Sequence, residues 1–187
     1  MTPNRLVWAV TVCVFALGCS DSTGPGGLSG TVTFNYTGGG GGTFNVSGRM
    51  PTIAADAGED DWAAGFRDSP NSQISIAGAR ARTAGRYDLA FIGIGRLAVG
   101  TENVDANCEP DLEVCTGLVL LIDISEADDA FAFICALGTG SIAITEITST
   151  RVRGSFSGTG ACANGSVTSF TVTGGTFDVP LVPNFPL

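Results

Sequence analysis

The 187 residues of this chain include no histidine, so carboxylates, cysteines and arginines are the side chains that could do chemistry. Histidine is the commonest general base and the commonest metal ligand in proteins, so both roles would fall to other groups. The GSFSG run at 154–158 has the outline of a hydrolase nucleophile turn, but Phe156 occupies the position of the nucleophilic serine. A serine hydrolase of that type is excluded.

Oxygen ligands that calcium could use alternate along one acidic stretch, which consists of Asp105, Asn107, Glu109, Asp111 and Glu113. Calcium takes about six to eight oxygens, and such alternation in a loop can supply them. The stretch has no glycine at the sharp-turn position of an EF-hand loop, and Pro110 interrupts it. We interpret it as a solvated acidic loop, and likewise the cluster of Glu59, Asp60 and Asp61, and we expect no metal site and no cofactor.

Two arginines, Arg151 and Arg153, share one polar strand face with Ser155 and Ser157. Such a face can bind an anionic ligand. Pairing across the sheet with an acid such as Glu146 is the simpler prediction, because opposite charges on neighbouring strands attract each other.

Two further patterns typical of enzymes fail in their context. Gly93-Ile94-Gly95, with Ala98, fits the loose form of a dinucleotide loop, but the residues that follow contain Gly, Asn and Pro and predict no helix. Carboxylate pairs for glycoside hydrolysis are expected by chance among eighteen acids, and the sequence places none across a cleft. We expect no catalytic residues and no enzyme activity.

The composition excludes several other classes of protein. Nine arginines and no lysine face eighteen acids, and the net charge of −9 argues against a nucleic-acid binder with a basic patch. Only 14% of the residues are charged, which argues against a coiled coil, and 44% are hydrophobic, which argues against a disordered chain. The length fits one domain with a core of its own.

Residues 1–18 have the layout of an export signal. Arg5 and the terminal amine precede a mostly apolar run, Leu6 to Leu17, which is twelve residues long. A membrane-spanning helix needs about 20 residues, so this run is too short to serve as one. The segment ends in Ala16-Leu17-Gly18-Cys19, which resembles the lipobox of bacterial lipoproteins. The resemblance implies cleavage before Cys19 and lipidation of that cysteine; ordinary cleavage nearby, with Cys19 unmodified, is the alternative.

The resemblance also has implications for localisation. In bacterial lipoproteins the residue after the lipidated cysteine influences sorting, and Ser20 favours the outer membrane. Acyl chains such as palmitate contribute about 0.8 kcal/mol of membrane affinity per buried CH₂ group. We expect a lipid-anchored protein of the bacterial cell envelope, with the membrane as one partner through its lipid anchor. We expect no nucleic-acid partner, and the sequence does not specify a protein or glycan partner.

Four cysteines remain beyond Cys19, namely Cys108, Cys115, Cys135 and Cys162. An even number in an exported domain predicts two disulfides, for which three connectivities are possible. We favour Cys108–Cys115, which closes a short acidic loop, and Cys135–Cys162, which ties a predicted core strand to a later hairpin. A metal or redox centre is disfavoured, because the chain has no CxxC spacing and no histidine.

Past residue 30 the sequence alternates with period two and is interrupted by glycine. Residues 32–36 and 43–47 each place apolar side chains on one face, and the glycine run between them predicts a hairpin. Residues 118–124 (LVLLIDI) are apolar on both faces, which predicts a buried central strand. The phase slips by one at Gly174-Gly175, which predicts a β-bulge or a tight turn. We expect at most one helical turn, at 54–64 or at 125–130.

About ten short strands separated by turn signals predict an all-β fold, which is either an antiparallel β-sandwich or a barrel-like domain. The expected organisation is a signal peptide at 1–18, a lipidated cysteine with a flexible Gly-, Ser- and Pro-rich tether at 19–29, and a single β-domain at 30–187.

The C-terminal third contains V-x-G-x-F-x-G at 152–158 and G-x-F-x-V at 175–179. These motifs look similar to the ends of small, β-rich bacterial lipoproteins of uncharacterised families, as does the opening TFNYTGGGGGTFNVSG. The resemblance covers roughly residues 28–48 and 140–181. It implies a compact β-domain and export, and it implies no activity.

These observations predict a non-enzymatic, lipid-anchored module on the bacterial envelope with a binding or structural role. The alternative is a carbohydrate- or calcium-binding accessory domain, with Trp62 and Tyr87 as stacking platforms and residues 105–113 as the calcium loop. An enzyme that uses carboxylates alone is a third hypothesis.

Overall fold

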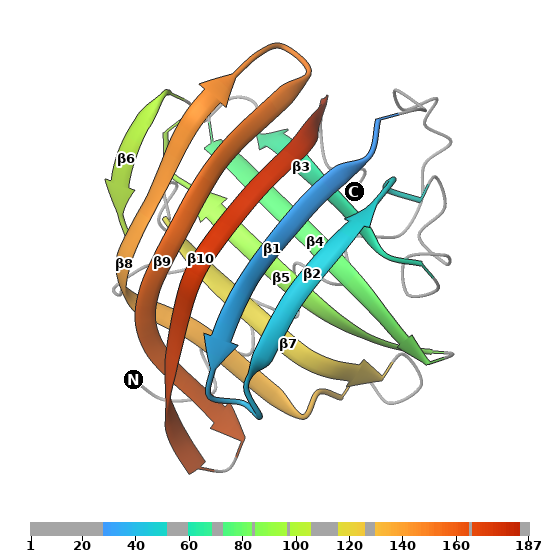
Figure 1. The fold of residues 1–187 in the computed structure, drawn as a ribbon, viewed down its shortest axis with the longest axis vertical. Coiled ribbons are helices and arrows are strands. Elements are labelled where there is room, and N and C mark those ends of the chain that lie inside the picture. Colours follow the sequence, from blue (N-terminus) through green and yellow to red (C-terminus); the bar gives the residue numbers. More distant parts are fainter. Residues whose placement is uncertain are drawn as a thin grey trace.

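The computed structural model describes residues 28–51, 60–68, 73–83, 85–96, 98–105, 116–125, 130–164 and 166–183. These residues form ten strands and no helix, which confirms the predicted all-β class (Figure 1). The strands are β1 (Gly30–Thr37), β2 (Gly42–Gly48), β3 (Trp62–Asp68), β4 (Gln73–Thr83), β5 (Arg86–Ile94), β6 (Gly100–Asn103), β7 (Gly117–Ser125), β8 (Phe133–Ile147), β9 (Arg151–Asn164) and β10 (Ser166–Pro183). Within these ranges no helix has the length and hydropathy needed to cross a membrane.

The strands form two layers that face each other. The front layer in Figure 1 contains β8, β9, β10, β1 and β2, and the back layer contains β3, β4, β5 and β7, with strands running in a crossing direction. Neighbouring strands are antiparallel except for β3 and β10, which pair in parallel at residues 65–67 and 181–183. The pairings form a closed circuit, β3-β4-β5-β7-β8-β9-β10, to which the β1–β2 hairpin and β6 are attached at the side. The domain is thus a sandwich with joined layers and not a regular barrel.

Glycines let β8 turn from the back layer into the front layer. Residues 133–136 of β8 pair with β7, whereas residues 141–144 pair with β6. At the turn Gly140 lies opposite Gly158, and Gly160 lies opposite Leu137. A Cβ atom on Gly160 would lie 1.9 Å from the carbonyl oxygen of Ala136, so no other residue fits there without backbone movement.

The main core lies between the two layers. The alternating apolar residues of β1 and β2, which are Val32, Phe34, Tyr36, Phe44 and Val46, are all buried there, as predicted. Phe34 is the centre of an aromatic group, with ring centroids 5.0 Å from Phe44 and 5.4 Å from Phe156. Such pairs add stability beyond the area they bury.

A second apolar cluster lies on the other side of the back layer. Its members include Trp62 and Phe66 on β3, Tyr87 on β5 and Ile124 on β7, all of which are buried. The back layer therefore carries apolar side chains on both faces. The sequence predicted this for residues 118–124 in β7.

Three strands are much longer than the short strands that we predicted from the sequence. β8, β9 and β10 have 15, 14 and 18 residues. From the sequence we expected the glycines within them to end the strands. In the structure these glycines lie at bends inside continuous strands. The predicted slip in phase is confirmed, because the β9–β10 register shifts between Val172 and Gly175 and Gly174 has a φ of 63°.

No helical turn occurs in the described parts of the two segments where one was expected. Residues 62–64 belong to β3, and Ser125 pairs with Ala130 in an isolated antiparallel bridge. Residues 52–59 and 126–129 lie outside the described ranges.

The turn between β1 and β2 requires glycine at every position from 38 to 42, where all φ angles are positive. A Cβ atom on Gly38 would lie 2.1 Å from the carbonyl oxygen of Ser169, whereas one on Gly40 would meet nothing within 4 Å. We expect Gly40→Ala to cost about 1–2 kcal/mol of stability from backbone strain alone. Gly38→Ala should cost clearly more, because it adds a clash with backbone. Urea unfolding of both variants checks this, and equal losses would contradict it.

Candidate functional site

Five charged residues meet at the end of the sandwich where β4 leads into β5, and we name them the Asp88 cluster: Arg80, Arg82, Arg86, Asp88 and Asp123. Arg80 lies directly opposite Asp88 in the β4–β5 register, and a register shift follows between Ala81 and Thr83. The Arg82 side chain also reaches Asp88, although the two residues are not register partners. Asp123 comes from the end of β7, where its φ of 60° marks a local irregularity.

Asp88 is the buried centre of the cluster, with a side chain that is 0% exposed. Its Oδ2 accepts hydrogen bonds from Nε of Arg80 at 3.0 Å and from Nη2 of the same residue. Its Oδ1 accepts bonds from Nε of Arg82 and from the backbone N–H of Asp123, both at 2.7 Å. A buried carboxylate costs stability unless it is paired and hydrogen-bonded, and here both oxygens are satisfied.

The arginines connect this carboxylate to its surroundings. Arg80 donates from Nη1 to the carbonyl oxygen of Thr43 on β2 at 2.5 Å, and its guanidinium lies 5.3 Å from the Phe44 ring centroid. Arg86 binds Asp123 through two nitrogens, each at 2.6 Å. The cluster thus links β4, β5 and β7 to one another and, through Arg80, to β2.

The electrostatics of the cluster keep Arg82 charged. Its hydrogen bond to Asp88 raises the pKa of Arg82 above the ordinary value. Burial opposes this rise, and the charges of Asp88 and Asp123 add to it. Three arginines and two aspartates leave the cluster with one excess positive charge in a chain of net charge −9.

A second group of charges lies on the outward face of β8, β9 and β10. Arg153 binds Glu146 at 2.7 Å, which confirms the predicted cross-strand pair. Arg153 also binds Asp178 at 3.0 Å, and Arg151 binds the same carboxylate. Asp178 was not predicted from the sequence as a member of this group, and it lies opposite Arg153 in the β9–β10 register.

Asp178 makes this second group sensitive to acid. Burial tends to raise the pKa of Asp178, but the hydrogen bonds and the positive charges of Arg151 and Arg153 together outweigh it and hold the pKa below the ordinary 3.8. A carboxyl whose folded pKa is lowered stabilises the fold above its unfolded pKa and loses that effect as pH falls through the folded pKa.

We therefore expect Asp178→Asn to lower stability by about 1 kcal/mol or less at neutral pH, because water and salt screen the partly exposed pairs. The difference from the wild type should shrink as pH falls below about 4. Urea unfolding of both proteins between neutral pH and about pH 2 measures it. A difference that stayed constant over that range would contradict the assignment.

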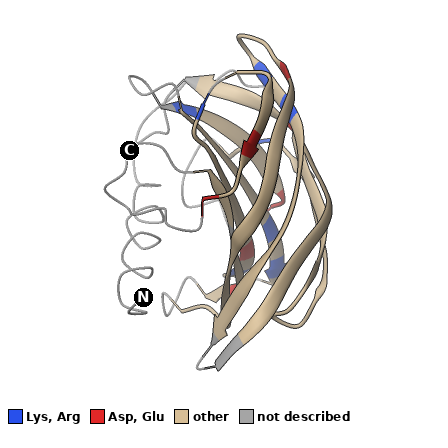
Figure 2. Ribbon diagram, turned by 90° about the vertical axis from the view of Figure 1, so that its left-hand side faces the viewer, with Lys and Arg blue, Asp and Glu red and all other residues tan. Residues whose placement is uncertain are grey.

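The outward side of the front layer carries a broad set of hydroxyl and amide groups, which we name the hydroxyl face. Its members are Thr31, Thr33, Asn35, Thr37, Thr43, Asn45, Ser47, Thr139, Ser141, Thr145, Ser155, Ser157, Thr159, Ser169, Thr171, Thr173 and Thr176. Some contact each other across strands, as Thr43 and Asn35 do at 2.8 Å and Thr139 and Thr159 at 3.0 Å. Long stretches of these strands lack charged residues (Figure 2).

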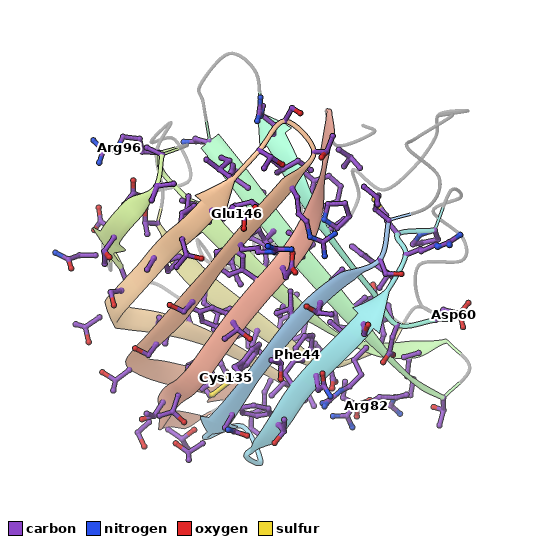
Figure 3. All side chains as sticks on the ribbon, turned by 45° about the horizontal axis from the view of Figure 1, so that its top comes forward. Phe44, Asp60, Arg82, Arg96, Cys135 and Glu146 are labelled. Atoms are coloured by element: carbon purple, nitrogen blue, oxygen red, sulfur yellow. A yellow bond between two sulfur atoms is a disulfide. The ribbon has the colours of Figure 1, made fainter. Side chains whose placement is uncertain are left out.

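The cysteine predictions fall partly within the described residues. A disulfide joins Cys135 on β8 to Cys162 on β9, two fully buried residues that are register partners (Figure 3). Gly39 of the β1–β2 turn packs over it, since a Cβ there would lie 3.0 Å from the Cys135 sulfur. Cys19 and the predicted pair Cys108–Cys115 lie outside the described residues.

The other candidate residues that the structure describes make hydrogen bonds within the fold. Asp105 is described, but residues 106–115 and Glu59 are not. Asp61 accepts a hydrogen bond from the backbone of Ala81 at 2.8 Å, and the backbone N–H of Gly95 donates to Thr116 at 3.0 Å. Among the described residues there is no group of three or more side chains suited to hold a metal ion.

The two proposed stacking platforms are not accessible in the structure. The side chains of Trp62 and Tyr87 belong to the second apolar cluster, and the residues are only 2% and 8% exposed. The prediction that they stack against sugars is wrong, because the back layer buries residues on both of its faces.

No family model matches the chain, and neither the curated proteins nor the solved structures contain one that is significantly similar to it. Its function is therefore inferred from its own residues and their arrangement.

Proposed function

We propose that the protein is an exported, lipid-anchored protein of the bacterial envelope and acts as a non-enzymatic binding or structural module. In this proposal the mature chain begins at a lipidated Cys19, and residues 20–29 link the anchor to the domain. The Cys135–Cys162 disulfide supports export, because such bonds persist mainly in oxidising compartments outside the cytoplasm. The described domain begins its first strand at Gly30, where the proposed tether ends.

The hydroxyl face is the observation that carries the proposed binding role. Apolar side chains fill the space between the layers, so recognition falls to the outer surface. The hydroxyl face presents donors and acceptors across five adjacent strands, and its charges are confined to the Glu146, Arg151, Arg153 and Asp178 group, which neutralises itself. Such a surface suits a polar, uncharged partner that is bound through hydrogen bonds.

A neutral glycan is the second candidate for the partner. The hydroxyl face offers hydrogen bonds to sugar hydroxyls without aromatic stacking, which keeps the carbohydrate hypothesis after the loss of Trp62 and Tyr87 as platforms. A glycan array with the purified protein tests it, with a Thr33→Arg/Thr173→Arg variant as the control. Binding that is absent, or that survives these two charges at the centre of the face, would remove this candidate.

The anchoring part of the proposal is tested by the intact mass of the protein extracted from membranes, with and without reductant and alkylation. We expect a mass for cleavage before Cys19 plus acyl chains, and no free thiol before reduction. An unlipidated mass with free thiols would overturn the proposal.

The binding part is tested by a photo-crosslinking residue placed at Thr33, in the middle of the hydroxyl face, in living cells. Val99, which is 61% exposed and lies outside that face, is the matched control position. We expect a discrete adduct from position 33 and none from position 99. Adducts of equal yield at both positions, or none at position 33, would contradict a binding role for this face.

A further inference from the structure

Arg82 differs from the other arginines of the Asp88 cluster in the donors that it leaves unused. Arg80 uses all three of its guanidinium nitrogens, on Asp88 and on Thr43. Arg82 uses only Nε, on Asp88, and within the described ranges no hydrogen bond or ion pair involves its Nη1 or Nη2. Two terminal nitrogens with four N–H donors are therefore left over.

The unused end of Arg82 is held in place and reaches solvent. Its Nε is fixed by a carboxylate that is itself fully buried, while the Arg82 side chain is 38% exposed. Fixing one edge of the planar guanidinium fixes the direction of the other edge, so less conformational entropy is lost when a ligand binds there. Figure 3 shows Arg82 at the end of the sandwich near the start of β2.

The two most exposed charges of the cluster are positive. Asp88 is 0% exposed, Arg80 24% and Asp123 26%, whereas Arg82 and Arg86 are 38% and 49% exposed. The excess positive charge of the cluster is thus displayed toward solvent.

We infer that the Nη1 and Nη2 edge of Arg82 is a binding site for an oxyanion group of a ligand, either a phosphate or a carboxylate. The two donors of a guanidinium edge match two oxygens of either group in a fork arrangement. The site is separate from the hydroxyl face, and its existence does not depend on lipid anchoring.

The test is a titration of the purified full chain with sodium phosphate and, separately, with sodium acetate. The arginine Nε–H resonances are followed by NMR, and the Arg82 signal is identified by its absence in Arg82→Gln. Affinity in every variant is read from the Nε–H signals of Arg80 and Arg86, which the substitutions at position 82 leave in place. Concentrations extend to about 0.1 M, where the Debye length is about 10 Å. The two arms distinguish a phosphate ligand from a carboxylate ligand.

Three variants separate a pre-oriented site from general attraction by charge. We expect Arg82→Gln to weaken binding about tenfold or more, which corresponds to the loss of a charge-assisted fork. Arg82→Lys keeps the charge but loses the fork, so it should also weaken binding. Arg96→Gln removes an arginine that is 74% exposed and whose acidic partner among the described residues, Glu102, is 3.8 Å away, so it should change affinity less than about twofold.

Several outcomes would overturn the inference. One is a wild-type protein whose Arg82 resonance moves with neither anion. Another is equal weakening by Arg82→Gln and Arg96→Gln, which would indicate attraction by charge alone. A third is unchanged binding by Arg82→Lys. Thermal unfolding of each variant shows whether it is folded. If Arg82→Gln does not fold, Arg82→Lys still tests the inference.

Discussion

Asp88→Asn is expected to lower the free energy of unfolding by about 3 kcal/mol, measured by urea denaturation at neutral pH. Asp88 is fully buried and accepts hydrogen bonds from two arginines and one backbone amide. An asparagine keeps the shape but replaces one carboxylate oxygen by an N–H₂ group, so two N–H donors lose their acceptor. Breaking a buried ionic group by changing one partner is costly because the other charges remain without compensation.

Asp123→Asn is the matched control for this prediction. Asp123 also binds an arginine through two bonds, but the Arg86 and Asp123 side chains are 49% and 26% exposed. Its left-handed backbone conformation suits asparagine as well as aspartate, so the substitution adds no strain. We expect a loss of less than about 1 kcal/mol. An Asp88→Asn variant as stable as Asp123→Asn would show that the cluster does not hold the strands together.

Removal of the Cys135–Cys162 disulfide has the largest expected effect on stability. The bond links residues 27 positions apart, and constraint of the unfolded chain by a loop of that length corresponds to about 3.5 kcal/mol. The Cys135→Ala/Cys162→Ala variant should lose at least this amount, because it also removes two buried sulfur atoms from the main core. Guanidinium or urea unfolding without reductant measures the loss.

Reductant separates the cross-link from packing. We expect reduction to destabilise the wild type by breaking the Cys135–Cys162 bond. The double variant lacks this bond, so its reduction cannot destabilise the fold in that way. A variant within about 1 kcal/mol of the oxidised wild type would contradict the prediction, because neither the cross-link nor the sulfur packing would then contribute much.

Local sequence patterns anticipated those features that depend on residues close in sequence. Period two placed Phe34, Phe44 and their neighbours in the core, and the slip at Gly174-Gly175 appeared as a bulge. The Cys135–Cys162 bond and the Arg153–Glu146 pair were also anticipated, because both connect strands that their patterns marked clearly.

The features that were missed depend on how distant strands are aligned. Arg80 and Asp88 meet because of the β4–β5 register, and Asp123 joins them because β7 lies beside β5. Neither fact is visible from the spacing of charges along the chain. Likewise, the burial of Trp62 and Tyr87 follows from a layer that is covered on both faces, and the long strands follow from glycines that bend a strand without ending it.

The parallel contact between β3 and β10 sets the order in which this chain can complete its fold. The circuit of strands closes only when residues 181–183, at the end of β10, pair with residues 65–67 in β3. Loop-closure entropy makes such distant contacts slow to form. The circuit of a chain that emerges from its N-terminus therefore stays open until residue 183 has been delivered. That property is compatible with the proposed export, in which the chain would cross a membrane before it folds.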